Sequence, residues 1–260
     1  MLYDVAMIAT LPMYDWPEVR EATDRWWKGM ARHLHVDMPL SRLDSHSAAW
    51  KRDDLLFSQT CGYPFTHALA DRVKLVATPH YAVDGCEGAR YQSLILAREK
   101  APLEKFRGAT AAVNAPASMS GMLALKLVFA PLAVLGKFFG HVIETGGHIA
   151  SMRAVREGLA DVCAIDAVCV AMARRYRPDY LEGLVEVALS PMVPGLPYIT
   201  KAGDVTAIRD ALKRAFTDPD LQKARDHLFL SGFSLLEPQD YDEITKREAA
   251  MERAGAMELL

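Results

Sequence analysis

Apolar positions along the chain follow two alternating patterns. Short continuous apolar runs, typical of buried strands, are followed by longer stretches in which apolar residues recur every three or four positions, typical of amphipathic helices. Strands that alternate with helices through short loops predict an α/β fold with mixed, mainly parallel sheets covered on both faces. The clearest helical stripe, within 18–34, consists of Val19, Ala22, Trp26, Met30 and Leu34.

The same patterns divide the chain into predicted elements. The first part is expected to hold strands over 4–11, 40–43, 54–58 and 73–78 and helices over 18–34 and 64–70. The middle part is expected to hold strands over 91–98, 109–114, 142–145, 161–166 and 184–189, with helices from Ser118, over 148–157 and over 167–175. The tail is expected to hold a strand over 196–200 and then helices over 205–216, 219–230 and 238–254.

Two short stretches rich in proline or glycine indicate crossings between lobes. The stretch 190–197 (SPMVPGLP) is stiffer than a flexible linker, and 85–90 (GCEGAR) provides a matching crossing. We therefore expect two Rossmann-like lobes joined by a two-segment hinge. Lobe 1 would be discontinuous, with residues 1–90 and 190–260, and lobe 2 would cover 91–189.

Composition and charge exclude several classes of protein. The 260 residues are 51% apolar and 24% charged, with a net charge of -3, so disorder is excluded and no nucleic-acid partner is expected. The longest clean apolar run, 127–136, is half of what a membrane span needs, so we expect no membrane insertion. The first residues show no secretory signal pattern. We expect a periplasmic location if a signal has been removed, and a cytoplasmic one otherwise.

The sequence shows no pattern for a metal or a cofactor and no complete catalytic motif. Its four cysteines form no CxxC pair, and neither GxSxG nor HExxH occurs. The cysteines suit buried thiols, and a Cys61–Cys86 disulfide is an alternative in an exported protein. Cys61, directly before Gly62, has the position of a catalytic nucleophile at a helix start. No histidine or aspartate can be assigned as its partner from the sequence. We therefore expect no catalytic residue.

The most informative segment lies between a buried strand and an apolar helix. It runs over 114–121 (NAPASMSG), with Ser118, Met119, Ser120 and Gly121 at the expected helix start. Helix starts offer N–H groups and a positive dipole end to an anion, and ligands of open α/β sheets bind at the carboxyl ends of strands. Ordinary capping by Ser118 is the alternative interpretation.

Similar turns follow other predicted strands. His148 opens a helix after Gly146 and Gly147, and Asp166 ends an apolar strand; each is a candidate ligand contact or, alternatively, a structural residue or helix cap. The first lobe contributes candidates from three strand ends: Tyr14, Thr60, Cys61, Tyr63 and Tyr81.

These residues together resemble the phosphate/phosphonate-type (PhnD-like) solute-binding proteins of ABC transporters. That family pairs an S-x-S-G helix start with a later G-x-H-x-A…AV-x-x-G-x-A-D-V-x-A-x-D stretch, and the resemblance is specific over about 91–170. The positions that fall on the motif are Ser118, Ser120, Gly121, His148, Ala154, Val155, Gly158, Asp161, Val162 and Asp166.

The resemblance implies a type II periplasmic-binding-protein fold and a non-catalytic component of an uptake system, with a permease as partner. It implies that Ser118, Ser120 and nearby N–H groups hold a small anionic or polar ligand, with His148 as a further donor. Asp166 would face a cationic or hydroxyl part of the ligand, and Tyr14, Thr60 and Tyr63 would close on it from lobe 1. A cytoplasmic sensor or a biosynthetic enzyme on the same fold is the alternative.

Overall fold

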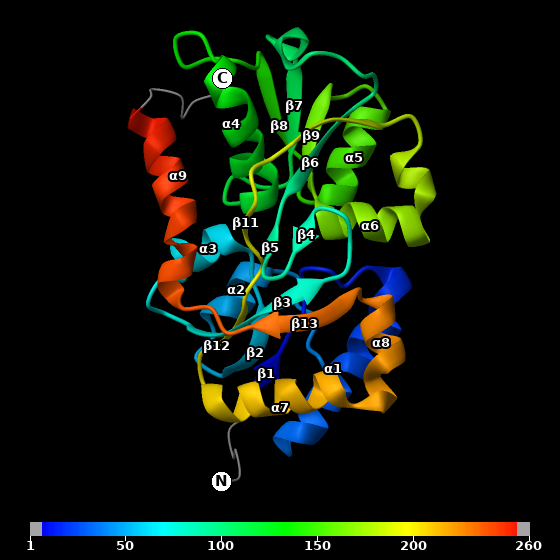
Figure 1. Cartoon of the computed structure of the whole chain (residues 1–260), viewed down its shortest axis with the longest axis vertical. Helices are drawn as coiled ribbons and strands as arrows, with labels where there is room; N and C mark the ends of the chain where they lie inside the picture. The colour runs from blue at the N-terminus through cyan, green and yellow to red at the C-terminus, as the bar shows by residue number, and fades with distance from the viewer. Residues whose placement is uncertain (1–6, 254–260) are drawn as a thin grey trace. The chain divides into compact units, whose positions relative to one another are not determined.

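A computed structural model describes residues 7–253, which divide into two compact units (Figure 1). Unit 1 holds the residues up to Ala82, Glu87–Ala89 and Gly195–Asp240. Unit 2 holds Val83–Cys86, Arg90–Pro194 and the residues from Tyr241 onward. The last helix therefore belongs to unit 2, although the sequence pattern assigned the whole tail to the first lobe.

The sheet of unit 1 has the strand order β1-β2-β12-β3-β13. Strand β12 runs antiparallel to both neighbours, so β2 and β3 are parallel to each other without being paired. The sheet is thus mixed, with a smaller parallel share than the alternating pattern predicted. The strands are β1 (Ile8–Ala9), β2 (Leu55–Gln59), β12 (Tyr198–Thr200), β3 (Lys74–Tyr81) and β13 (Leu230–Ser234).

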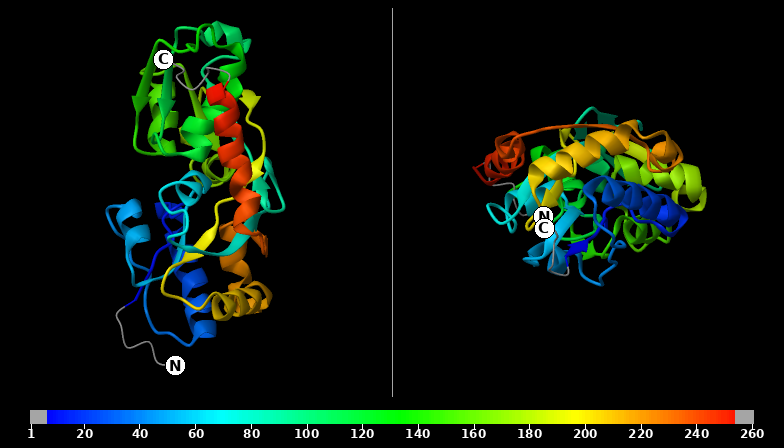
Figure 2. Two further views of the ribbon diagram at one scale, coloured as in Figure 1. Left: turned by 90° about the vertical axis from the view of Figure 1, so that its left-hand side faces the viewer. Right: turned by 90° about the horizontal axis from the view of Figure 1, so that it is seen from below.

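Helices α1, α7 and α8 pack together and onto the sheet of unit 1. Figure 2, seen from below, shows α7 beside α1, and α7 also packs on β3. The buried stripe of α1 includes Trp26, Trp27 and Met30, which confirms the predicted apolar stripe in its central part. The helices of this unit are α1 (Arg20–Leu34), α2 (His46–Lys51), α3 (Gly62–Thr66), α7 (Val205–Thr217) and α8 (Gln222–His227), with the 3₁₀ turns η1 (Pro17–Val19) and η6 (Pro219–Leu221).

The sheet of unit 2 has the strand order β10-β6-β9-β7-β8. Strand β7 is parallel to both of its neighbours, whereas β6 is antiparallel to β9 and β10. Every residue of β6 and β9 is buried. The strands are β6 (Ser93–Ala97), β7 (Thr110–Val113), β8 (His141–Glu144), β9 (Val162–Asp166) and β10 (Val185–Leu189).

Helices cover both faces of this second sheet, with α4 on one side and α5 and α6 on the other (Figure 1). The chain leaves β7 for β8 in one direction and returns past β7 to β9. Right-handed crossovers therefore place α4 and α5 on opposite faces. The helices are η3 (Met119–Leu123), which is a π-helix, α4 (Ala124–Phe129), α5 (His148–Arg156) and α6 (Ala167–Tyr176), with the 3₁₀ turns η2 (Leu103–Phe106), η4 (Ala130–Leu132) and η5 (Pro178–Leu181).

The chain passes between the units near both predicted crossings and at a third place, 240–241. A small sheet of β4 (Cys86–Glu87), β5 (Arg90–Tyr91) and β11 (Val193–Pro194) forms where the first two passages meet. After the 3₁₀ turn η7 (Pro238–Tyr241), α9 (Asp242–Arg253) packs on β11, and its Glu243 forms an ion pair with Arg90 at 2.8 Å. This contact explains why the last helix belongs to unit 2.

Several predicted elements differ in the structure. Segment 40–43 is not a strand: the Ser41 N–H donates to the Ala9 carbonyl, but no ladder follows. The helix predicted over 219–230 stops at His227, because Phe229 adopts a positive φ of 57° and the chain turns into β13. Helix α2 and the π-helical turn at 119–123 had not been predicted. The predicted positions 4–6 and 254 lie outside the described residues.

Candidate functional site

The candidate ligand site in unit 2 lies where β7, β8 and β9 end. These three parallel strands present the segments 114–121, 145–148 and Asp166 at the same edge of the sheet. The chain leaves β7 and β9 toward opposite faces, and such a switch point is where open α/β sheets bind their ligands. The structure therefore brings together the residues that the sequence proposed for this lobe.

Ser118 and Ser120 are buried at the start of the π-helix. Ser118 caps it: its hydroxyl oxygen accepts the Gly121 N–H at 3.0 Å, so the capping interpretation is confirmed for this side chain. The Leu123 N–H donates to the Ser118 carbonyl five residues back, at 2.9 Å. π-turns of this kind are uncommon and occur frequently at functional sites. Met119 is buried at the first position of the turn.

Gly121 is required by a close approach of Asn114, a residue that the sequence analysis did not propose for the site. A Cβ atom at position 121 would lie 1.8 Å from Asn114 Oδ1. That oxygen is shielded from solvent and has no hydrogen-bond partner. The absence of a side chain at Gly121 thus lets the strand end and the helix start pack against each other.

His148 connects the start of α5 to the start of the π-helix. Its Nε2 lies 2.8 Å from Ser120 Oγ. Its Nδ1 is shielded from solvent without a hydrogen-bond partner. Burial lowers the pKa of His148 to about 4, so the imidazole is neutral at pH 7. The turn before it needs glycine at Gly146, whose φ is +84°.

Asp166 is buried at the end of β9, 1% exposed, opposite Ser93 on β6. Its carboxylate accepts the Val168 N–H at 2.8 Å and so caps α6, as the alternative interpretation stated. Burial raises the pKa of Cys86 to about 12 and also raises the pKa of Cys169, and the negative charge of Asp166 adds to both increases. A thiol with a raised pKa is a weak nucleophile. All four cysteines are free thiols.

The first-lobe candidates gather at the strand ends of unit 1. Tyr14 and Tyr81 form an edge-to-face pair with ring centroids 5.2 Å apart, and the Gln59 amide donates to Tyr81 Oη at 3.0 Å. Gln59, which directly precedes Thr60 in the sequence, was not proposed as a site residue.

Three further candidates lie around the start of α3. Thr60 is buried and its N–H donates to the Pro197 carbonyl, while Cys61 is the N-cap of the helix and is half-buried. The Tyr63 ring stacks on His67 with centroids 3.9 Å apart. The structure thus brings Tyr14 and Tyr81 together and places Thr60, Cys61 and Tyr63 on one short segment.

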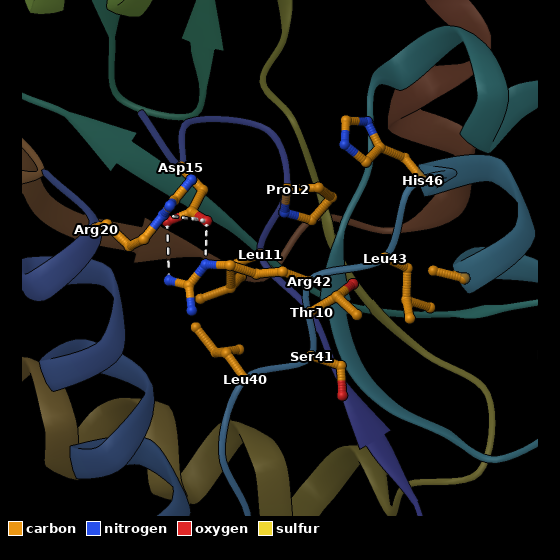
Figure 3. A pocket seen from close by; sticks show the side chains of 11 residues that line it. Thr10, Leu11, Pro12, Asp15, Arg20, Leu40, Ser41, Arg42, Leu43 and His46 are labelled. Atoms are coloured by element: carbon orange, nitrogen blue, oxygen red, sulfur yellow. Dashed lines mark hydrogen bonds and ion pairs between the residues drawn. The ribbon is translucent and has the colours of Figure 1, made fainter. Parts of the chain in front are cut away.

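Unit 1 also contains a cavity of about 210 Å³ after β1, shown in Figure 3. Arg42 binds Asp15 with both its Nε (2.6 Å) and a terminal nitrogen (3.2 Å), and it binds Asp24 at 2.8 Å. The hydrogen bond to Asp15 raises the pKa of Arg42. Burial lowers the pKa of His46, which also lines the cavity. Its charged groups are therefore paired with one another.

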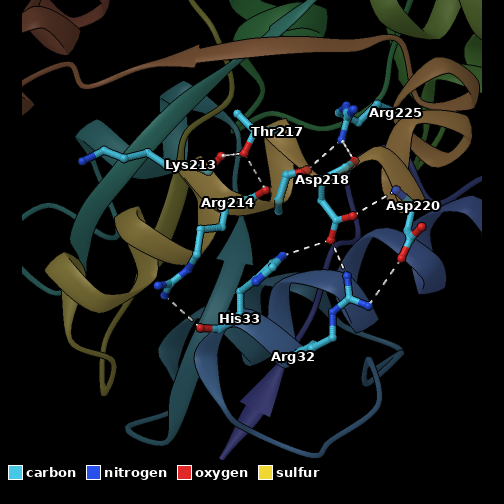
Figure 4. A network of polar contacts seen from close by, with 9 residues as sticks. Arg32, His33, Lys213, Arg214, Thr217, Asp218, Asp220 and Arg225 are labelled. Carbon is cyan, nitrogen blue, oxygen red and sulfur yellow. Dashed lines mark hydrogen bonds and ion pairs between the residues drawn. The ribbon is translucent and has the colours of Figure 1, made fainter.

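A second ionic network in unit 1 holds α1 against the turn between α7 and α8. Asp218 accepts hydrogen bonds from Arg32 and from His33, and the buried Arg225 donates to the Asp218 and Ala215 carbonyls (Figure 4). Each of these charges is satisfied by the protein itself, so we assign the network a structural role.

The described residues contain no candidate metal site and no candidate membrane-spanning helix. Within 7–253, no group of three or more histidine, cysteine, aspartate or glutamate side chains could hold a metal ion. In the same part of the chain, no helix has the length and apolar character to cross a membrane.

Comparison with known families decides what this arrangement belongs to. Residues 8–242 match the model of the family described as ABC transporter, phosphonate, periplasmic substrate-binding protein. The chain belongs to this family. Its members are solute-binding components and not enzymes, which confirms the resemblance stated from the sequence motif and the expectation of no catalytic activity. The family description also gives the periplasm as the location of its members.

Solved structures confirm the type II periplasmic-binding-protein fold. PhnD1 from Prochlorococcus marinus, in complex with methylphosphonate, is 14% identical with a TM-score of 0.78, covering 95% of this chain and 98% of that one. A binding protein component of an ABC phosphonate transporter from Pseudomonas aeruginosa is 17% identical with a TM-score of 0.77, covering 95% and 87%. XAC2383 from Xanthomonas citri, bound to ATP, is 17% identical with a TM-score of 0.69, covering 96% and 98%. No curated protein matches the sequence.

Proposed function

We propose that this protein captures a small phosphonate or phosphate-like anion at the start of the π-helix in unit 2 and delivers it to an ABC transporter permease. The observation that carries the proposal is the cluster of Ser118, Ser120 and His148 at the switch point of the sheet. The first N–H groups of the helix have no intrahelical acceptor and lie at its positive end, so they suit an oxyanion.

Three observations support this ligand class. The cluster is uncharged, since His148 is neutral, so it can bind an anion without burying an unpaired cation. The family is one of phosphonate-binding proteins, and one structural neighbour is solved with methylphosphonate. Asp166 fits a ligand that also carries a proton or an amine, because a bare carboxylate would repel a phosphonate.

The family resemblance extends the proposal to unit 1. Tyr14, Thr60 and Tyr63 would complete the ligand contacts as the units close about the hinge, with Cys61, Tyr81 and Met119 as supporting residues. Saturating methylphosphonate should then reduce the radius of gyration measured by X-ray scattering. An unchanged radius in the presence of bound ligand would overturn the closing step alone.

The anion site itself is tested by removing both hydroxyls. The double variant S118A/S120A should bind methylphosphonate about 2–4 kcal/mol more weakly by calorimetry, at roughly 1–2 kcal/mol for each charge-assisted hydrogen bond. The matched control is S47A, at an exposed position of helix α2 in unit 1, which should bind as the wild type does. Equal affinity of the double variant and the wild type would reject the helix start as the site.

A further inference from the structure

The pairing of His148 with Ser120 leaves one ring nitrogen without a partner. Nε2 lies 2.8 Å from Ser120 Oγ, and Nδ1 faces the protein interior with no hydrogen bond. A neutral imidazole carries its proton on one of these two nitrogens, and the choice fixes which group donates in the pair.

The two tautomers differ in what they leave unsatisfied. With the proton on Nδ1, the Ser120 hydroxyl donates to Nε2 and a buried N–H has no acceptor. With the proton on Nε2, the imidazole donates to Ser120 Oγ and only an acceptor lone pair is left unpaired. Buried N–H groups without an acceptor are rarer in proteins than under-satisfied acceptors, and an imidazolium would add the same orphan donor. The protonated Nε2 is therefore favoured.

From this we infer that His148 is a positioning residue: it is held as the neutral Nε2–H tautomer and donates to Ser120 Oγ, so that the Ser120 hydroxyl proton is left to donate to the ligand. This inference rests on the proposed function for its final step. It also changes the role expected from the family resemblance, in which His148 itself was the donor to the ligand.

The hydroxyl group of Ser118 also accepts a hydrogen bond from the protein. Its hydroxyl oxygen accepts the Gly121 N–H at 3.0 Å, which uses one of its two lone pairs and leaves its own proton to donate. Both serines thus have their oxygen occupied by a protein donor and their proton directed elsewhere. The two serine hydroxyls thus each present a donor that suits a ligand oxygen without hydrogen, while the buried Asp166 carboxylate suits a ligand group that carries one.

The tautomer can be measured without any ligand. In protein labelled with ¹⁵N-histidine, two-bond ¹H–¹⁵N spectra at pH 7 distinguish the two neutral forms and the imidazolium, and the H148Q variant assigns the signal. The inference expects the Nε2–H form for His148. An Nδ1–H or imidazolium signal would overturn it.

The positioning role is tested by a double-mutant cycle with methylphosphonate. H148L should weaken binding about 10-fold, and H148Q, whose amide can still donate to Ser120 Oγ, should stay within about 3-fold of wild type. In the S120A background, H148L should cost less than about 2-fold. A 10-fold loss in that background as well would show that His148 contacts the ligand directly and would overturn the positioning role.

The two kinds of failure are distinguishable. If the wild type binds no methylphosphonate, the proposed function fails while the tautomer is still decided by the spectra. Thermal unfolding of each variant, followed by circular dichroism, separates loss of binding from loss of fold.

Discussion

The polar groups that follow β1 in unit 1 and those that follow β7 and β8 in unit 2 are satisfied in different ways. After β1 in unit 1, Asp15, Arg42 and Asp24 carry full charges that are paired with one another. After β7 and β8 in unit 2, the polar groups of Ser118, Ser120 and His148 are uncharged. With the tautomer inferred for His148, the two hydroxyl protons are not used within the cluster. The same position is thus filled by paired charges in one unit and by neutral polar groups in the other.

In the proposed site of unit 2, an anion would be bound without a cation. In unit 1 the guanidinium of Arg42 joins the end of β1 to α1, and its charge is cancelled where it stands. In unit 2 the neutral donors avoid the cost of burying an unpaired charge when no ligand is present. We therefore expect changes in the ion pairs of Arg42 to affect stability alone, and changes around Ser120 to affect binding as well.

The largest effect is expected from closing the space at Gly121. G121A places a Cβ atom 1.8 Å from Asn114 Oδ1, so the strand end and the helix start must separate. We expect a loss of about 2–3 kcal/mol in the free energy of unfolding, typical of overpacking a tight contact, together with loss of methylphosphonate binding. Urea denaturation and calorimetry measure the two effects.

Two further variants make this test specific. G147A is the matched control, because nothing lies within 4 Å of a Cβ at that position. Adding N114A to G121A removes the clashing oxygen and should restore most of the stability. If G121A and G147A were equally stable, the close approach of Asn114 would not be the reason for glycine at 121.

The second effect concerns pH. The pKa of His148 is about 4 in the folded protein and about 6.5 when unfolded, so below pH 6.5 the unfolded chain binds the extra proton. The stability contributed by the neutral imidazole is complete above pH 6.5 and is lost as the pH falls toward 4. Between pH 7 and pH 5 the wild type should lose about 2 kcal/mol more than H148Q.

Urea denaturation at a series of pH values measures this difference. Parallel stability curves for the wild type and H148Q would mean that the imidazole is not held neutral by burial.

The sequence predicted the helix starts of unit 2 well because the signals there are local. Each signal depends on only a few neighbouring residues: the apolar runs, Ser118 before an apolar helix, and the glycines before His148. The S-x-S-G and G-x-H patterns then identified the family over the same segment. What these patterns could not show is that Ser120 and His148, 28 positions apart, form a hydrogen bond.

The errors of the sequence analysis arose where distant contacts decide. The last helix joins unit 2 because Glu243 pairs with Arg90, 153 positions away. The sequence pattern predicted that the helix would continue to residue 230. Strand β13 forms there instead because it pairs with β3 at the edge of the sheet. Asn114 was quoted only as the first residue of its segment, because its importance depends on the packing of Gly121.

The smallest effect is expected from a substitution in unit 1. It tests directly whether the paired charges of unit 1 contribute to stability and not to binding. D15N removes a nearly buried carboxylate that binds Arg42 in two places, so we expect a loss of about 1 kcal/mol in the free energy of unfolding with unchanged affinity for methylphosphonate. D54N removes an equally two-pronged but local pair with Arg52 and should cost less, since both partners already lie two residues apart in the unfolded chain. A fall in affinity beyond about 2-fold in D15N would show that the paired charges of unit 1 also serve the ligand, and the contrast between the two units would then be wrong.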